Sequence, residues 1–175
     1  MKRKILFFVL LMVAMSFNSY SQNLKYQGEV NVAGALGYGD WSYNRFNVET
    51  VHGLRLTDNF FVGAGVGWHS YNRSADEFIM EDEQFSLIPV FFDVKGYLTY
   101  GKISPYATFD IGYSITTGMV SGHNGFYFAP GIGASYNFSA KNAISLGVSL
   151  QSQTLAGYPA RLTMNSFAIK IGFTF

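Results

Sequence analysis

The sequence predicts an all-β fold, a closed eight-stranded antiparallel up-and-down β-barrel that spans a membrane. Charged residues make up 13% of the chain and aromatic residues 18%, whereas soluble domains carry roughly 25% charged residues. After residue 15, no apolar run reaches the roughly 18 residues that indicate a membrane-spanning helix. Apolar residues instead recur at every second position, which is the period of a β-strand. In a bilayer only helices and closed barrels satisfy every backbone hydrogen-bonding group, so the barrel is the remaining solution.

The N-terminal segment has the features of a secretory signal peptide. Basic residues at positions 2–4 precede an apolar run over 5–15, and a small-x-small pattern ends at Ser21. The run is about half of the roughly 20 residues that a transmembrane helix needs. We therefore expect a signal peptide over 1–21, cleaved after Ser21, and one barrel domain over 22–175.

Four strands are expected in the first half of the chain, where the alternation has exceptions. The first and third repeat alanine or glycine at alternate positions, and the second and fourth carry charged residues at alternate positions. The expected ranges are 25–38, 44–56, 60–72 and 85–98.

Four further strands are expected in the second half, where the alternation is nearly strict. In the final "FAIKIGFTF", every second residue is apolar and the last is a phenylalanine. The expected ranges are 104–117, 125–138, 143–153 and 166–175. These lengths suit the roughly 9 to 11 residues with which a tilted strand crosses a bilayer. Within the second of these strands, Pro130 removes a backbone donor, so we expect a bulge or locally broken pairing there.

The links between the expected strands alternate between short and long. Short polar turns are expected at 56–60, 100–103 and 138–143, and longer links at 39–43, 73–84, 118–124 and 154–165. Outer-membrane barrels have short periplasmic turns and longer external loops. The alternation therefore places both termini in the periplasm.

The alternating faces are assigned by residue size. One face is rich in alanine and glycine, and glycine weakens a solvated strand because it packs nothing. Glycine suits the crowded interior of an eight-stranded barrel, which is just wide enough for side chains to fill. We therefore expect the large apolar side chains to face lipid, the reverse of a soluble ligand carrier.

The charged residues within the strands fall on the interior face. Four acids meet four bases, so the interior is formally neutral, and an unpaired ion there would cost roughly several kcal/mol. We expect an internal salt-bridge network that fills the bore and fixes the strand register; the alternative is that the charges line an ion path. The eight residues are Glu29, Arg45, Glu49, Arg55, Asp93, Lys95, Asp110 and Lys170.

The whole chain after the leader resembles the small outer-membrane β-barrel family, OmpA/OmpX-like in architecture. The stretches "FFVGAGVGW", "KISPYATFDIGYSI" and "FYFAPGIGASYNFS" resemble the version of this barrel domain found in Bacteroidetes. The resemblance implies a Gram-negative outer membrane and assembly by the barrel-assembly machinery, which reads a terminal phenylalanine preceded by alternating apolar residues. The implied assembly signal comprises Phe167, Ile169, Ile171, Phe173 and Phe175.

The sequence contains no recognisable catalytic, metal or cofactor signature. A serine hydrolase needs a histidine beside its serine, but His69 and Ser70 are adjacent and so lie on opposite strand faces. His52 falls on the lipid face, and His123 lies in a long link. The acidic segment 76–83 could hold a divalent cation, but it lacks calcium-loop spacing, and a solvated acidic loop is the preferred interpretation. We expect no cofactor.

Composition also limits the partners. There is no cysteine, so neither a disulfide framework nor a thiolate metal site is present. Without the leader, nine basic residues face eleven acidic ones, and no basic face indicates nucleic acid. We expect a monomer in the outer-membrane bilayer that is not an enzyme and has a structural, envelope or surface-interaction role. The alternatives are a lipid A-modifying enzyme, a small pore or a ligand carrier.

Overall fold

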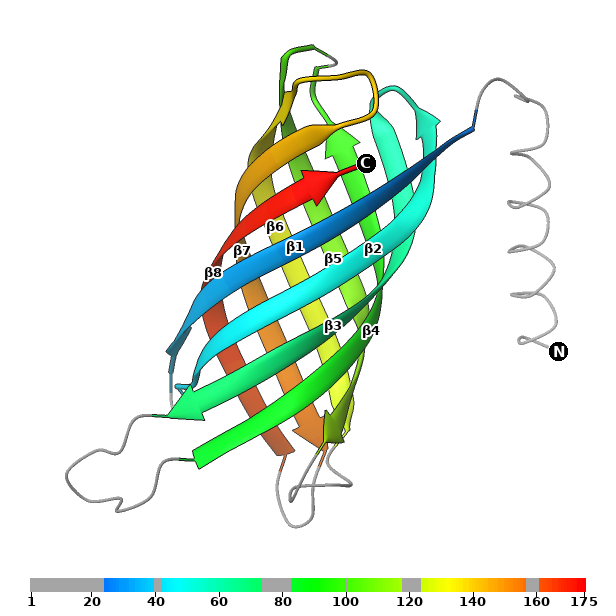
Figure 1. Ribbon diagram of the computed structural model, residues 1–175. Helices are drawn as coiled ribbons and strands as arrows, with labels where there is room; N and C mark the ends of the chain where they lie inside the picture. The colour runs from blue at the N-terminus through cyan, green and yellow to red at the C-terminus, as the bar shows by residue number, and fades with distance from the viewer. Residues whose placement is uncertain (1–23, 40–41, 74–82, 100, 118–123, 157–160) are drawn as a thin grey trace, which may run out of the picture.

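The computed structural model describes residues 24–39, 42–73, 83–99, 101–117, 124–156 and 161–175. Within these ranges eight antiparallel strands follow one another around a closed barrel (Figure 1). The strands are β1 (Lys25–Tyr38), β2 (Asn44–Thr57), β3 (Phe60–Arg73), β4 (Glu83–Tyr97), β5 (Ile103–Thr117), β6 (Gly125–Asn137), β7 (Ala143–Ala156) and β8 (Arg161–Thr174). β8 pairs with β1, with Ala35 opposite Ala168, so the sheet closes without a free edge. The predicted fold class is confirmed.

Some expectations fall outside the described residues. These are the signal peptide over 1–21, His123 and most of the acidic segment 76–83. In the part of the chain that the structure describes, no helix has the length and apolar character needed to cross a membrane.

The predicted boundary of the last hairpin was wrong. The sequence predicted a link over 154–165, whereas β7 continues to Ala156 and β8 begins at Arg161. The ladder runs on through Thr154 opposite Thr163 and Leu155 opposite Leu162. The reason is a reversal of polarity, because Leu155 and Met164 are apolar and buried inside the barrel here. A search for apolar residues on the outer face misses this stretch.

The two ends of the barrel differ in their connections. We call one the turn end, because short turns join β2 to β3, β4 to β5 and β6 to β7 there. β1 begins at this end, and the C-terminus also lies there, as Figure 1 shows. The opposite end, which we call the link end, carries the two longest connections, of nine residues between β3 and β4 and of seven between β5 and β6. Its β1–β2 and β7–β8 connections have five and four residues, no more than the five-residue turns between β4 and β5 and between β6 and β7.

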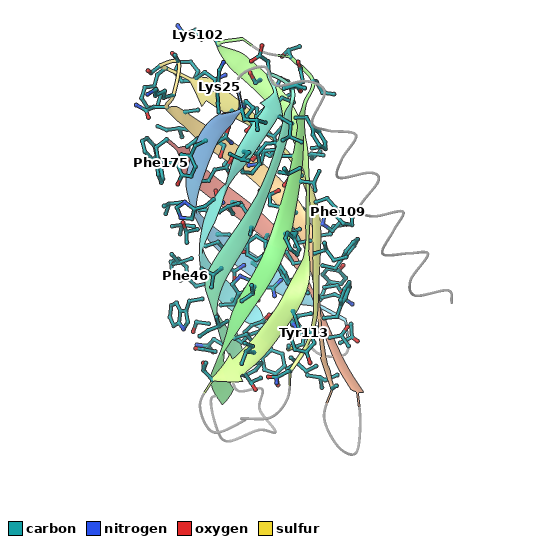
Figure 2. The ribbon with its side chains drawn as sticks, turned by 90° about the vertical axis from the view of Figure 1, so that its right-hand side faces the viewer. Lys25, Phe46, Lys102, Phe109, Tyr113 and Phe175 are labelled. Atoms are coloured by element: carbon teal, nitrogen blue, oxygen red, sulfur yellow. The ribbon has the colours of Figure 1, made fainter. Side chains whose placement is uncertain are left out.

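Large apolar side chains point away from the barrel axis on every strand. Figure 2 shows this for Phe46 on β2, Phe109 and Tyr113 on β5, and Phe175 at the C-terminus. Alternate residues on the same strands are buried, as the burial pattern of β7 shows along its whole length. The barrel therefore has an apolar exterior and a separate, packed interior.

Glycine makes room for aromatic rings inside the barrel. A Cβ atom at Gly65 would lie 2.5 Å from the Phe91 ring, and one at Gly133 or Gly147 would lie within 2.7 Å of the Tyr106 side chain. Phe91 and Tyr106 belong to a buried aromatic cluster in the interior. The alternating glycines therefore fit the rings that fill a narrow bore.

Pairing is interrupted at two prolines. The β6–β7 ladder pairs Phe128 with Ser152 and resumes at Gly131, so it skips Pro130 without a change of register. The expected broken pairing is found, and the bulge is not. Pro89 in β4 has the same effect on the β3–β4 ladder, which the sequence reading did not anticipate. In each case the proline lacks the backbone donor that a continuous ladder requires.

Candidate functional site in the barrel interior

A buried lysine on β4 lies between two carboxylates. Lys95 Nζ is 2.5 Å from Glu29 Oε2 on β1 and 3.9 Å from Asp93 Oδ2 on its own strand. Gln27 Nε2 donates to the second oxygen of Glu29 at 2.7 Å, and Thr108 donates to Asp93 at 2.7 Å. Every charge in this group therefore has a partner, as burial requires.

A second lysine, on β8, forms a similar group. Lys170 Nζ is 2.8 Å from Glu49 Oε2 on β2 and 3.3 Å from Asp110 Oδ2 on β5. His69 Nε2 lies 2.9 Å from the other Glu49 oxygen, and the Tyr127 hydroxyl donates to that oxygen at 3.4 Å. The lysine therefore bridges strands that are not neighbours in the sheet.

The two arginines contact aromatic residues. Arg45 donates to the Tyr71 hydroxyl and to Ser166 Oγ, and its guanidinium also lies 5.2 Å from the centre of the Tyr71 ring. Arg55 lies at the other end of β2, with its guanidinium 4.5 Å from the centre of the Tyr97 ring. Guanidinium groups stack well on aromatic faces, so these contacts hold the positive charges within the bore.

Each lysine group has one positive charge and two negative charges. The two groups together therefore have a net charge of −2 when His69 is not counted. Arg45 and Arg55 provide these charges from either end of β2. The structure thus places the eight sequence-predicted residues in two carboxylate–lysine groups flanked by two arginines, and ion pairs of 4 Å or less join each lysine to two acids.

Sequence reasoning missed several neutral or titratable members of this interior. His69 was considered only as a partner for Ser70, yet it is fully buried beside Glu49. Tyr71 and Tyr97 were also missed as partners of the arginines. All three lie at positions that alternate with outward residues, so the same period that placed the charges could have found them.

Towards the link end, Arg45 is the buried charge among side chains that are neutral and polar and then apolar. Asn47 donates to Gln151 at 3.0 Å, and Ser114 donates to Gln153 at 2.7 Å. Beyond them lies a buried apolar cluster, to which we refer as the link-end cluster. Its members are Tyr43, Tyr71, Leu87, Leu155 and Met164, with Phe85 and Leu162 packed against it. Side chains therefore fill the bore from the ionic middle to the link end.

The predicted assembly-signal residues lie on the outer face of the closing strand. The five side chains are those of Phe167, Ile169, Ile171, Phe173 and Phe175, and each is exposed on the barrel exterior. The ring of Phe175 covers Gly28 of β1, where an added Cβ would lie 2.6 Å from the ring. Backbone hydrogen bonds of 2.9 Å in both directions also join Gly28 and Phe175.

The remaining described histidine, His52, is on the outer face near the turn end. Its Nδ1 atom is 2.6 Å from the Tyr26 hydroxyl, and its Nε2 atom is 3.0 Å from Thr50 Oγ1. The Thr50 hydroxyl donates to the carbonyl of Glu29 at 3.1 Å, so its single proton is already used. His52 then donates to Thr50 and accepts from Tyr26. Toward Thr50, this is the opposite of the arrangement in which a histidine activates a hydroxyl nucleophile.

The described residues contain no group of three histidine, cysteine, aspartate or glutamate side chains that could hold a metal ion. No protein-family profile matches the chain. No curated protein matches its sequence either.

Three solved structures illustrate the similarity of fold. Neisserial surface protein A (NspA) has a TM-score of 0.62 and 13% identity, over 87% of this chain and 98% of that one. The outer membrane protein AlkL, solved in DMPC lipid bilayers, has a TM-score of 0.54 and 12% identity, over 89% and 90% of the two chains. The outer membrane enzyme PagL has a TM-score of 0.53 and 12% identity, over 81% and 97%. The chain therefore has the fold of an eight-stranded transmembrane β-barrel.

Proposed function

We propose that this protein is a non-enzymatic integral barrel of the outer membrane, with a structural, envelope or surface-interaction role. The observation that carries the proposal is the combination of an outer face of exposed apolar side chains with an interior of paired charges. Such a surface is unfavourable in water and favourable in hydrocarbon. The closed ladder supports the same conclusion, because it leaves no unpaired edge facing lipid.

The proposal includes a route to the membrane and an orientation. Residues 1–21 act as the signal peptide, and the barrel-assembly machinery reads Phe167, Ile169, Ile171, Phe173 and Phe175 on the closing strand. The turn end faces the periplasm, and the link end faces the outside and offers its two long connections, β3–β4 and β5–β6, to surface partners. Resemblance of the strand sequences supports a Bacteroidetes-type barrel that functions as a monomer.

The filled interior argues against the pore alternative. An ion path would need a continuous aqueous bore, but the link-end cluster and the two lysine groups occupy the interior. The eight charges then serve as a salt-bridge network that fills the bore and fixes register. Planar-bilayer recordings of the purified barrel should show no stable unitary conductance, and a reproducible channel would favour the pore.

The enzyme alternative draws support from PagL, which shares the fold. In this chain the Thr50 hydroxyl beside His52 donates to a backbone carbonyl, and His69 is buried beside Glu49. Mass spectrometry of lipid A from cells that express the protein should show the same species as lipid A from control cells. A new deacylated or acylated species would contradict the non-enzymatic assignment.

Membrane fractionation combined with a heated and unheated detergent gel tests the main proposal. The protein should remain in the outer-membrane fraction, and its unheated form should migrate differently from its heated form because a folded barrel resists the detergent. A folded, water-soluble monomer that needs no lipid or detergent would overturn the proposal.

A further inference from the structure

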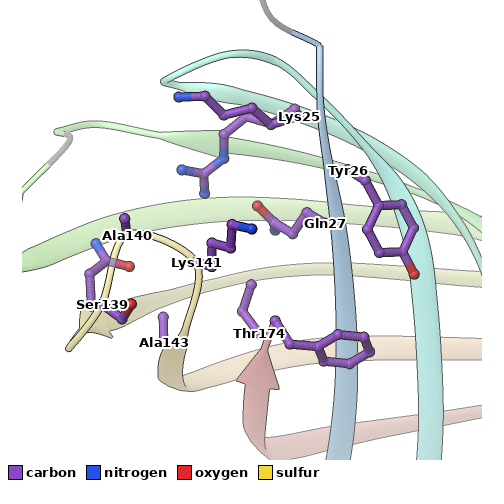
Figure 3. Close-up of a pocket in the computed structure, with 11 residues that line it drawn as sticks. Lys25, Tyr26, Gln27, Ser139, Ala140, Lys141, Ala143 and Thr174 are labelled. Carbon is purple, nitrogen blue, oxygen red and sulfur yellow. The ribbon is translucent and has the colours of Figure 1, made fainter.

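The turn end of the barrel opens into a cavity that the proposed structural role does not use. It has a volume of about 510 Å³ and is lined by residues of β1, β2, β6, β7 and β8, of the β6–β7 turn and by the C-terminal Phe175 (Figure 3). We call it the turn-end cavity. Its volume lies within the range of small-ligand sites, which is roughly 300 to 1,000 Å³.

Three positively charged side chains line the turn-end cavity. Lys25 comes from β1, Arg55 from β2 and Lys141 from the turn between β6 and β7. Figure 3 shows Lys141 extending from its turn toward Gln27, with Lys25 above them. The positive charges therefore converge from segments far apart in the sequence. The hydroxyl groups of Ser139 and Thr174, which also line the cavity, add neutral hydrogen-bond donors.

The negative charges around the cavity are fewer. Phe175 is among the residues that line it, and its carboxyl group accepts a hydrogen bond from the Gly28 amide at 2.9 Å. Asp58 lies 3.7 Å from Lys25, but both side chains are about 60% exposed, so the pair is weak in water. No aspartate or glutamate side chain is among the described residues that line the cavity.

The floor of the cavity separates it from the acids of the interior. Gln27 uses its amide nitrogen to donate to Glu29 at 2.7 Å and to the Tyr97 hydroxyl at 3.3 Å. Glu29 is in turn paired with Lys95. The interior carboxylate next to the floor is therefore occupied, and it does not neutralise the lysines at the rim.

We propose that the turn-end cavity binds an anionic group with at least two negative charges, of phosphate or carboxylate chemistry. Charge-assisted hydrogen bonds from ammonium and guanidinium groups are the strong contacts for such an anion. The source is either a soluble anion on that side of the membrane or the headgroup of a neighbouring anionic lipid. This inference goes beyond the proposed function and adds a ligand site to it.

The test uses the folded barrel in phosphatidylcholine nanodiscs, titrated with inorganic pyrophosphate by calorimetry. One saturable site per barrel is expected, and Lys141→Gln or Lys25→Gln should each weaken binding by about tenfold, the equivalent of one charge-assisted contact. Lys102→Gln is the matched control, because Lys102 lies on the β4–β5 turn at the same end but does not line the cavity. Both substitutions in the cavity replace exposed side chains and should leave the heat-dependent gel shift unchanged.

Absence of saturable binding, or equal weakening by Lys102→Gln, would overturn the site. Repeating the titration in nanodiscs with phosphatidylglycerol identifies the source of the anion. Weaker pyrophosphate binding there at equal ionic strength assigns the site to a lipid headgroup, and unchanged binding assigns it to a soluble anion. Failure of these titrations would leave the fractionation and conductance tests of the proposed function unaffected.

Discussion

Ile169 and Lys170 are neighbours in β8, yet they face opposite surroundings. Ile169 points outward and is 53% exposed, whereas Lys170 reaches into the bore between Glu49 and Asp110. The outer face contacts hydrocarbon, and it makes no contact with one particular acyl chain, because any acyl chain can replace another. The inner face depends on particular distances between named atoms. The two faces of a single strand should therefore respond very differently to substitution.

The interior itself has two regions. Its middle contains ion pairs between strands distant in the sheet, and its link end is a cluster of aromatic and aliphatic side chains. Both are closely packed, but the ion pairs lie in the middle, and the buried charge at the link end, Arg45, is held by the hydroxyl groups of Tyr71 and Ser166. Replacement by a residue of similar size should cost most in the middle, and truncation should be costly in both.

Lys170→Met should lower the free energy of unfolding more than any other substitution proposed for the two faces. The methionine keeps much of the length of the side chain, but Glu49 and Asp110 lose the ammonium group that lies 2.8 and 3.3 Å away. Breaking a buried pair in this way costs about 3 to 5 kcal/mol. Reversible urea unfolding in detergent micelles should show the loss. The control is Lys102→Met, which removes an exposed lysine on a turn; equal midpoints for the two variants would mean that the interior ion pairs do not stabilise the barrel.

Leu87→Ala tests the apolar end of the same interior. Leu87 is fully buried in the link-end cluster, and its truncation should cost about 2 to 5 kcal/mol, because the closed bore leaves a cavity. Leu146→Ala is the matched control, since Leu146 is exposed on the outer face and lipid or detergent can fill the space. The same unfolding experiment compares the two. A larger loss for Leu146→Ala would reverse the assignment of inside and outside.

Ile169→Lys brings a charge to the other side of the same strand. A lysine on the lipid face costs about 2 to 4 kcal/mol near the bilayer midplane and much less near the interfaces. The variant should unfold at lower urea concentration in lipid vesicles, whereas Ile169→Leu should match the parent. Tolerance of the lysine without loss of stability would show that this face does not contact hydrocarbon.

The sequence was sufficient to predict the architecture, because apolar residues recur at every second position in every strand. It predicted eight strands and the inward direction of Glu29, Asp93 and the other charged residues, and the structure buries or partly buries all eight. It did not predict that β7 extends past Gln153 or that β8 begins before Ser166, because Leu155 and Met164 are apolar residues on the inner face. Alternation separates the residues of a strand into two faces. Apolar residues mark the outer face only where that face contacts hydrocarbon.

The partners of the interior charges could not be predicted from the period. Lys170 on β8 meets Glu49 on β2 and Asp110 on β5, and these contacts cross the bore. They depend on strand tilt, on barrel diameter and on the length of each side chain. The stacking of Arg55 on Tyr97 and the burial of His69 beside Glu49 have the same origin. The sequence was enough to predict which charged residues lie in the interior, but not which of them contact each other.

Gly28→Ala is expected to have the smallest effect, and it examines the seam where β1 meets the C-terminus. The ring of Phe175 covers Gly28 so closely that a Cβ there would lie 2.6 Å from it, whereas nothing lies within 4 Å of a Cβ at Gly34 on the same strand. The atoms in the way are the far edge of an exposed ring that can move aside, so the cost should be about 0.5 kcal/mol or less, and Gly34→Ala should be near neutral. The proposed assembly signal includes Phe175, so Gly28→Ala should also slow the appearance of the folded band during refolding into vesicles. Equal folding rates and stabilities for the two variants would mean that the contact between the Phe175 ring and Gly28 does not contribute to folding. Closure of the barrel would then depend only on the β1–β8 backbone ladder.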